Sequence, residues 1–164
     1  MGYEIGCKRG VATHYGPRSA DGQYGGQDNS DGKIKEASWT FDYDKLPAYS
    51  ASNLEMQIPA NATIAHAHIR VLTGATSGGT AHIEVGTTAT DGTGADPNSL
   101  ITTSEATWTL VQVKGNRIAG AGALIGKTVG TKAVELTVTP AATLTGGKFE
   151  VVVQYQYNLV ACNT

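Results

Sequence analysis

From about residue 34 to residue 157 the chain alternates between apolar and polar residues. In 35–43 this alternation places four apolar side chains on one face, Ala37, Trp39, Phe41 and Tyr43. Successive side chains of a strand point to opposite faces, so a period of two indicates a strand with one buried face. The same period predicts strands at 54–58, 63–72, 80–86, 133–140 and 148–157, and shorter strands are expected near 100–103 and 107–113.

The residues expected to face inward are small, branched or aromatic. In chain order they are Leu54, Met56, Ile58, Ala65, Ala67, Ile69, Val71, Ala81, Ile83, Val85, Val134, Leu136, Val138, Phe149, Val151, Val153, Tyr155 and Tyr157. We expect 63–72 and 80–86 to pair as a hairpin, because a short run rich in Gly, Ser and Thr connects them. The polar run 87–99 is expected to be a long loop.

About eight to nine strands separated by turn residues, without a helix, predict one all-β domain at 34–164. Short connections and the alternation favour antiparallel pairing, since strands of parallel sheets are buried on both faces. We therefore predict an antiparallel β-sandwich, jelly-roll-like, with an extended N-terminal arm at 1–33.

Residues 1–33 lack both the strand and the helix period and are rich in Gly, Asp, Ser and Gln. Such a segment buries too little apolar surface to offset its ordering entropy, yet this one carries tyrosines, which are enriched where flexible segments bind partners. The segment could be a docking arm, or it could be a disordered tail or a locally packed loop. We favour the docking arm. The predicted interface residues are Tyr3, Ile5, Arg9, Tyr15, Arg18, Tyr24, Tyr155 and Tyr157, although the last two could instead complete the core.

Charge and composition argue against several classes of partner and location. The formal net charge is −2, and no Lys/Arg block interleaves with aromatics, so no nucleic-acid partner is expected. No apolar run approaches the ~18 residues of a membrane span, and residues 1–16 do not form a secretory signal. Cys7 and Cys162 could pair, but a chain made in a reducing cytoplasm favours free thiols.

Two metal sites are conceivable. His66 and His68 lie on the polar face of their strand, and a register that brings His82 opposite His68 would approximate a three-histidine zinc site. The alternative register, with Arg70 opposite His82 and His68 opposite Glu84, gives an ordinary polar ladder, which we favour. Oxygen ligands at Asp91, Asp96 and Asn98 could hold calcium, but these are also common turn residues. No metal or cofactor is expected.

No catalytic motif is found. The glycines at 120, 122, 126 and 130, followed by Lys127-Thr128, do not have the spacing of a phosphate-binding loop. The chain also lacks the Gly-x-Ser-x-Gly turn of a hydrolase nucleophile. We expect no enzymatic activity.

The segment 58–103, IPANATIAHAHIRVLTGATSGGTAHIEVGTTATDGTGADPNSLITT, and the terminal strand KFEVVVQYQY resemble small structural proteins of tailed bacteriophages. The resemblance covers about residues 55–158 and leaves out the arm sequence HYGPRSADGQYGG. It implies a virion component made in the host cytoplasm, a cement or decoration protein on the capsid surface. Its implied partners are the major capsid protein and other copies of itself, as a dimer or trimer.

Two other functions remain open. A head-fibre or tail subunit of the same virion would share this composition, but should show a fibre-forming repeat or an attachment helix. A carbohydrate-binding sandwich would present exposed coplanar aromatics. Trp39 is expected to face inward, whereas the facing of Trp108 is open.

Overall fold

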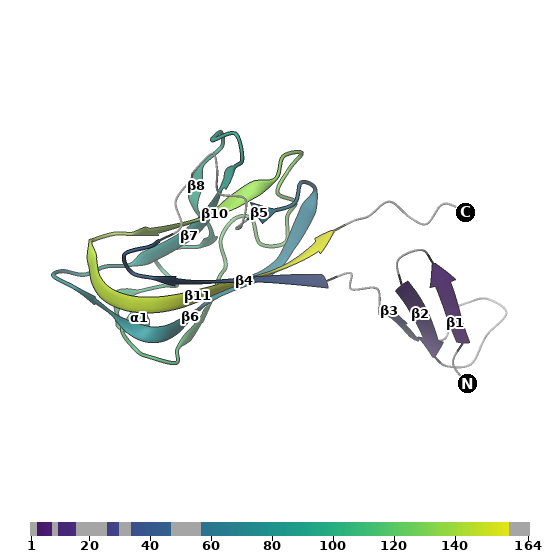
Figure 1. The fold of residues 1–164 in the computed structure, drawn as a ribbon, viewed down its shortest axis with the longest axis horizontal. Helices are drawn as coiled ribbons and strands as arrows, with labels where there is room; N and C mark the ends of the chain where they lie inside the picture. Colours follow the sequence, from purple (N-terminus) through teal and green to yellow (C-terminus); the bar gives the residue numbers. More distant parts are fainter. Residues whose placement is uncertain (1–2, 8–9, 16–25, 30–33, 47–56, 158–164) are drawn as a thin grey trace.

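The structure is a computed structural model that describes residues 3–7, 10–15, 26–29, 34–46 and 57–157 (Figure 1). Side chains are described for 34–46 and 57–156. Within these ranges, no helix is long and apolar enough to cross a bilayer.

Two four-stranded antiparallel sheets pack face to face and form the body of the molecule (Figure 1). One sheet has the strand order β4-β11-β6-β9, and the other has the order β5-β10-β7-β8. The strands are β4 (Ile34–Asp42), β5 (Gln57–Ile58), β6 (Ala62–Ser77), β7 (Ile83–Ala89), β8 (Asp96–Ile101), β9 (Arg117–Ala119), β10 (Val134–Pro140) and β11 (Leu144–Tyr157). The predicted antiparallel β-sandwich is confirmed, with eight strands in these two sheets.

The pairing shows why the sandwich is a jelly roll. The strands pair from the outside inwards: β4 with β11, β5 with β10, β6 with β9, and β7 with β8. The chain from β4 to β11 is therefore one long folded-back ribbon whose turn lies between β7 and β8. Rolling this ribbon adds the pairs β6–β11 and β7–β10, which complete the two sheets.

The alternation in the sequence builds the core between the sheets. The predicted inward residues of β10 and those of β11 as far as Val153 are buried, as are Ala81, Ile83 and Val85. Two predicted inward residues are exceptions: Tyr43 is 38% exposed just past the end of β4, and Ala65 is exposed while Ile64 is fully buried. Between the pairs Gln154↔His66 and Tyr155↔Ile64 strand β6 has one extra residue, a β-bulge that reverses the alternation.

Three sequence predictions about connections are wrong. Segments 63–72 and 80–86 do not form a hairpin, because β6 and β7 belong to different sheets. The expected loop 87–99 is too long, because only 90–95 connect the strands and its two ends belong to β7 and β8. Thr87 and Ser99 are buried and bond to each other at 3.0 Å between their hydroxyl oxygens, which allows polar residues inside the sheet.

The third error concerns 107–113, where the structure has a single helical turn, α1 (Trp108–Val111), instead of a strand. The backbone amides of Leu110 and Val111 both donate to the Thr107 carbonyl, at 3.0 and 3.1 Å, and Val111 is buried. So short an apolar run fits a buried turn as well as a strand.

The N-terminal segment contains strands that its sequence period did not indicate. The backbones of β1 (Tyr3–Cys7), β2 (Gly10–Tyr15) and β3 (Gly26–Asn29) form a three-stranded antiparallel sheet in the order β1-β2-β3. Ladder hydrogen bonds join backbone groups, so they can form without the alternation that a buried face requires. Its role as a docking arm remains a prediction.

Candidate functional site

One end of the sandwich, which we call the arm end, contains the start of β4, the end of β11 and the start of β6. Gln156 pairs with Ile34 on one side and with Thr63 on the other. Residues 1–33 therefore join the sandwich where 158–164 leave it. Nine consecutive pairs between β4 and β11 connect this junction to the core.

A groove of about 400 Å³ lies at the same end. One wall is segment 123–132, which is attached to the start of β6: Thr63 pairs with Thr128, and the Val129 amide donates to the Ala62 carbonyl at 2.9 Å. The other wall is the β7–β8 turn. Apolar side chains, threonines and two charged residues line the groove, among them Ala89, Thr93, Asp96, Leu124, Val129, Lys132 and Val134. The groove suits a small apolar group with polar neighbours.

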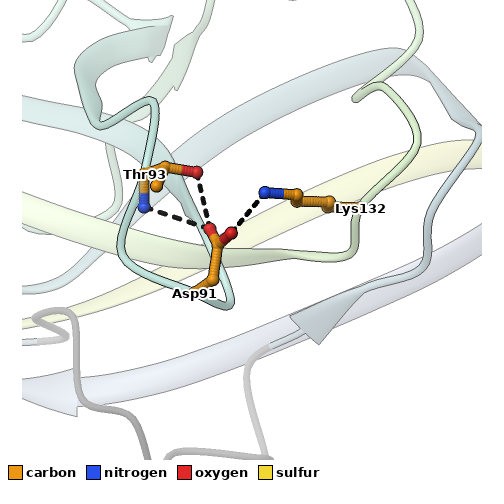
Figure 2. Close-up of polar contacts among 3 residues, drawn as sticks. All are labelled: Asp91, Thr93 and Lys132. Atoms are coloured by element: carbon orange, nitrogen blue, oxygen red, sulfur yellow. Dashed lines mark hydrogen bonds and ion pairs between the residues drawn. The ribbon is translucent and has the colours of Figure 1, made fainter.

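Asp91 connects the β7–β8 turn to the residues that precede β10 (Figure 2). Its Oδ1 accepts from the Thr93 amide at 3.1 Å and from the Thr93 hydroxyl at 2.6 Å, and its Oδ2 is paired with Lys132 Nζ. The Lys132 ammonium first, and then the Thr93 donors, hold the pKa of the Asp91 carboxyl well below its usual range. Asp91 thus attaches the β7–β8 turn, beside the groove, to the residues that precede β10.

Replacing Lys132 with methionine should raise the pKa of the Asp91 carboxyl towards its ordinary value near 3.8. Because the folded pKa lies below that of the unfolded chain, this carboxylate stabilises the fold above about pH 4 and loses that contribution as the pH falls further. Carboxyl-carbon NMR titration measures the change. Lys114→Met, at another exposed lysine, is the matched control and should leave Asp91 as it is. An unchanged Asp91 titration in Lys132→Met would contradict the assigned cause.

The carboxylates of the candidate calcium loop are engaged in contacts within the protein. Both Asp91 oxygens already have partners, and Asp96 belongs to β8, where its Oδ1 accepts from the Asn98 amide at 3.4 Å. Among the residues whose side chains are described, no three His, Cys, Asp or Glu side chains are grouped to hold a metal ion.

The three candidate zinc-binding histidines are not brought together. His66 and His68 lie on the outer face of the sheet β4-β11-β6-β9, with ring centroids 5.7 Å apart. His82 directly precedes β7 in the other sheet, where its carbonyl accepts from the Ala141 amide at 2.9 Å. Both proposed registers required β6 to pair with β7, so both are wrong.

The outer face of the sheet β4-β11-β6-β9 carries a polar ladder whose partners differ from those that the predicted register gave. Arg70 and Glu150, which are directly opposite, form an ion pair of 2.6 Å between Nη2 and Oε2. Gln154 Nε2 donates to Glu36 Oε2 at 2.9 Å, and Arg117 Nη2 donates to His68 Nδ1 at 3.2 Å. Sequence inspection did not single out Arg117, because it lies 49 positions from His68 in a run without strand alternation.

Of the predicted interface residues, only Tyr155 has a described side chain; it is half-buried and packs against the core. The backbones of Tyr3, Ile5 and Tyr15 lie in β1 and β2, and that of Tyr157 lies in β11. The remaining three, Arg9, Arg18 and Tyr24, lie outside the described residues. The structure therefore leaves the predicted docking contacts untested.

The two tryptophans do not form an exposed aromatic platform. Trp39 is 9% exposed and belongs to the core, and the half-buried Trp108 packs against this core.

A buried residue that sequence reasoning missed is Glu135, which is 1% exposed although Val134 and Leu136 beside it follow the predicted alternation.

Comparisons with known proteins give one structural likeness. No protein-family model matches the chain, and no curated protein sequence matches it closely. A chain of the solved structure "Cyanophage Pam1 capsid asymmetric unit" is similar in shape, with 16% sequence identity, a TM-score of 0.47, and coverage of 75% of this chain and 84% of that chain. A likeness of this size does not indicate what the present chain binds.

Proposed function

We propose that this protein is a structural component of a tailed bacteriophage virion, a cement protein that binds the outer shell of the head. In this proposal the arm bridges neighbouring capsid subunits while the sandwich sits on the surface. The partners are the major capsid protein and other copies of the chain. The resemblance of residues 55–158 to small phage structural proteins supports this class, and jelly rolls recur in viral capsid proteins.

The observation that carries the proposal is the geometry of the arm end. The 33 residues before β4 are joined to a rigid body by the nine-pair β4–β11 ladder. A binding segment attached to a second binding surface holds both at a high effective concentration, which increases avidity without adding contacts. The groove and the β7–β8 turn lie at the same end, which supports the proposal of a second binding surface there.

The arm's role is tested in the full chain by the triple substitution Tyr3→Ser, Tyr15→Ser and Tyr24→Ser. Buried tyrosines often contribute more than 1 kcal/mol each to an interface, so we expect occupancy on parent particles to fall about 10-fold or more at limiting concentration. Occupancy is measured by quantitative gel analysis of purified particles stripped of the protein and then rebound.

The matched control is Tyr43→Ser, which removes a tyrosine that is 38% exposed at the opposite end of the sandwich. It should bind particles like the wild type. Full occupancy by the triple variant, with unfolding unchanged, would overturn the arm's role.

Electron microscopy of the parent particle tests the location. The cement assignment expects density for the sandwich on the head shell, between neighbouring capsid subunits. Density confined to the tail or to a head fibre would reject that assignment and favour the alternative of a tail or fibre subunit.

A further inference from the structure

Strand β9 is a short edge strand with few attachments. Its three residues pair only with β6, through Arg117↔Arg70, Ile118↔Ile69 and Ala119↔His68. Just outside the ladder, the Val71 amide donates to the Asn116 carbonyl at 2.9 Å and the Gly120 amide to the Ala67 carbonyl at 2.8 Å. Ile118 is 5% exposed and belongs to the core. An edge this short opens locally at lower free-energy cost than the central strands, so side-chain contacts across it matter.

The contact between Arg117 and His68 joins β9 to β6 on the outer face. A guanidinium has only donors, so His68 Nδ1 must be the acceptor at 3.2 Å. The imidazole is therefore neutral, with its proton on Nε2. His68 is 7% exposed, and the buried Val152 lies opposite it on β11. Protonation of Nδ1 would remove the acceptor of the Arg117 bond.

Charged and titratable groups face His68 from every neighbouring strand. Arg117 is on β9, His66 and Arg70 are on β6 itself, Glu150 is on β11 and Glu36 is on β4. Both carboxylates already have partners, Arg70 for Glu150 and Gln154 for Glu36. Burial first, then Arg117 and His66, lower the pKa of His68 below its ordinary value of 6.5, against a smaller opposite effect of the two carboxylates.

We propose that the His68–Arg117 contact is an acid-sensitive attachment of the edge strand β9. When His68 is protonated, Arg117 loses its hydrogen-bond acceptor. Arg117 then faces two positive charges, the His68 imidazolium and Arg70, which lies directly opposite it. Strand β9 then opens more often. Opening uncovers Ile118 and the β6 backbone edge from Ala67 to Val71.

The direction of the pH effect follows from the order of the two pKa values. The His68 pKa lies below 6.5 in the closed state, and it rises when β9 opens, because Arg117 and part of the covering surface leave the ring. The open state therefore binds more protons below that pH. The attachment is at full strength above about pH 7 and weakens as the pH falls from 6.5 through the pKa of the closed state.

Hydrogen exchange of the full chain by NMR tests the proposal. Protection factors, which remove the intrinsic pH dependence of exchange, are compared at pH 7.5 and 5 for the amides of Ile118 and Gly120. We expect protection to fall by up to about 10-fold for each pH unit by which closure of β9 lowers the His68 pKa. The amides of β11 should keep their protection.

Two variants isolate the histidine. His68→Asn keeps an acceptor near the position of Nδ1 but cannot be charged, so β9 protection should no longer depend on pH. His66→Asn is the matched control on the same face and should retain the wild-type dependence. If His68→Asn still shows the dependence, or wild-type protection is equal at both pH values, the proposal is wrong.

A direct titration keeps the proposal testable if His68→Asn does not fold. The wild-type His68 ring resonances should titrate below 6.5, and Arg117→Gln should raise that pKa. A wild-type His68 that titrates at or above 6.5 overturns the proposal.

Discussion

Replacing Phe149 with alanine is expected to lower the free energy of unfolding by about 3–5 kcal/mol. Phe149 is fully buried on β11, directly opposite Phe41 of β4 and Val71 of β6. Its ring centroid lies 6.0 Å from that of Phe41. Because Phe149 lies on a strand paired on both sides, the neighbouring backbones cannot move in to fill the space, and a cavity remains between the sheets.

Equilibrium urea unfolding, followed by tryptophan fluorescence, measures this loss. Phe149→Leu retains most of the apolar volume and should cost clearly less than the alanine variant. Thr40→Ala, on the exposed face of the adjacent β4, should change stability by no more than about 0.5 kcal/mol. A loss of under about 1 kcal/mol in Phe149→Ala would contradict the packing described for this core.

The second large effect is expected at Gly86, in β7. Between the pairs Val85↔Ile101 and Thr87↔Asp96 the register shifts, and the β8 backbone crosses directly over Gly86. A Cβ at Gly86 would lie 2.0 Å from the Asp96 carbonyl oxygen and 2.4 Å from the Pro97 carbonyl carbon. These are backbone atoms, so β8 would have to move away. We expect Gly86→Ala to cost about 3 kcal/mol or more, at the upper end for overpacked sites.

Gly79→Ala is the matched control, because an added Cβ there meets no atom within 4 Å. It should be neutral or slightly stabilising, since alanine restricts the unfolded chain. The two variants are compared by thermal and urea unfolding, and the β8 amides by hydrogen exchange. Equal stabilities of the two variants would show that β8 does not depend on the close approach at Gly86.

The candidate sites depend on pairs that are distant in sequence. Asp91 and Lys132 are 41 positions apart, and His68 and Arg117 are 49 apart. Each residue alone is an ordinary polar residue of a strand or turn. Sequence inspection found Asp91 as an oxygen ligand and His68 as a polar-face histidine, but their partners are set by the rolling of the ribbon. The predicted zinc register failed for the same reason, since His82 was carried into the other sheet.

The sequence by itself determined most of the residues that face the core. Val134, Leu136 and Val138 are buried as their alternation predicts, because side-chain direction in a strand depends only on position along that strand. It could not locate the bulge at Ala65, where one unpaired residue reverses the alternation. Nor could it assign strands to sheets, since β6 buries the same face whether β7 is its hairpin partner or lies across the core. Only the tertiary structure decided that, because pairing depends on which backbone edges meet, and alternation carries no information about edges.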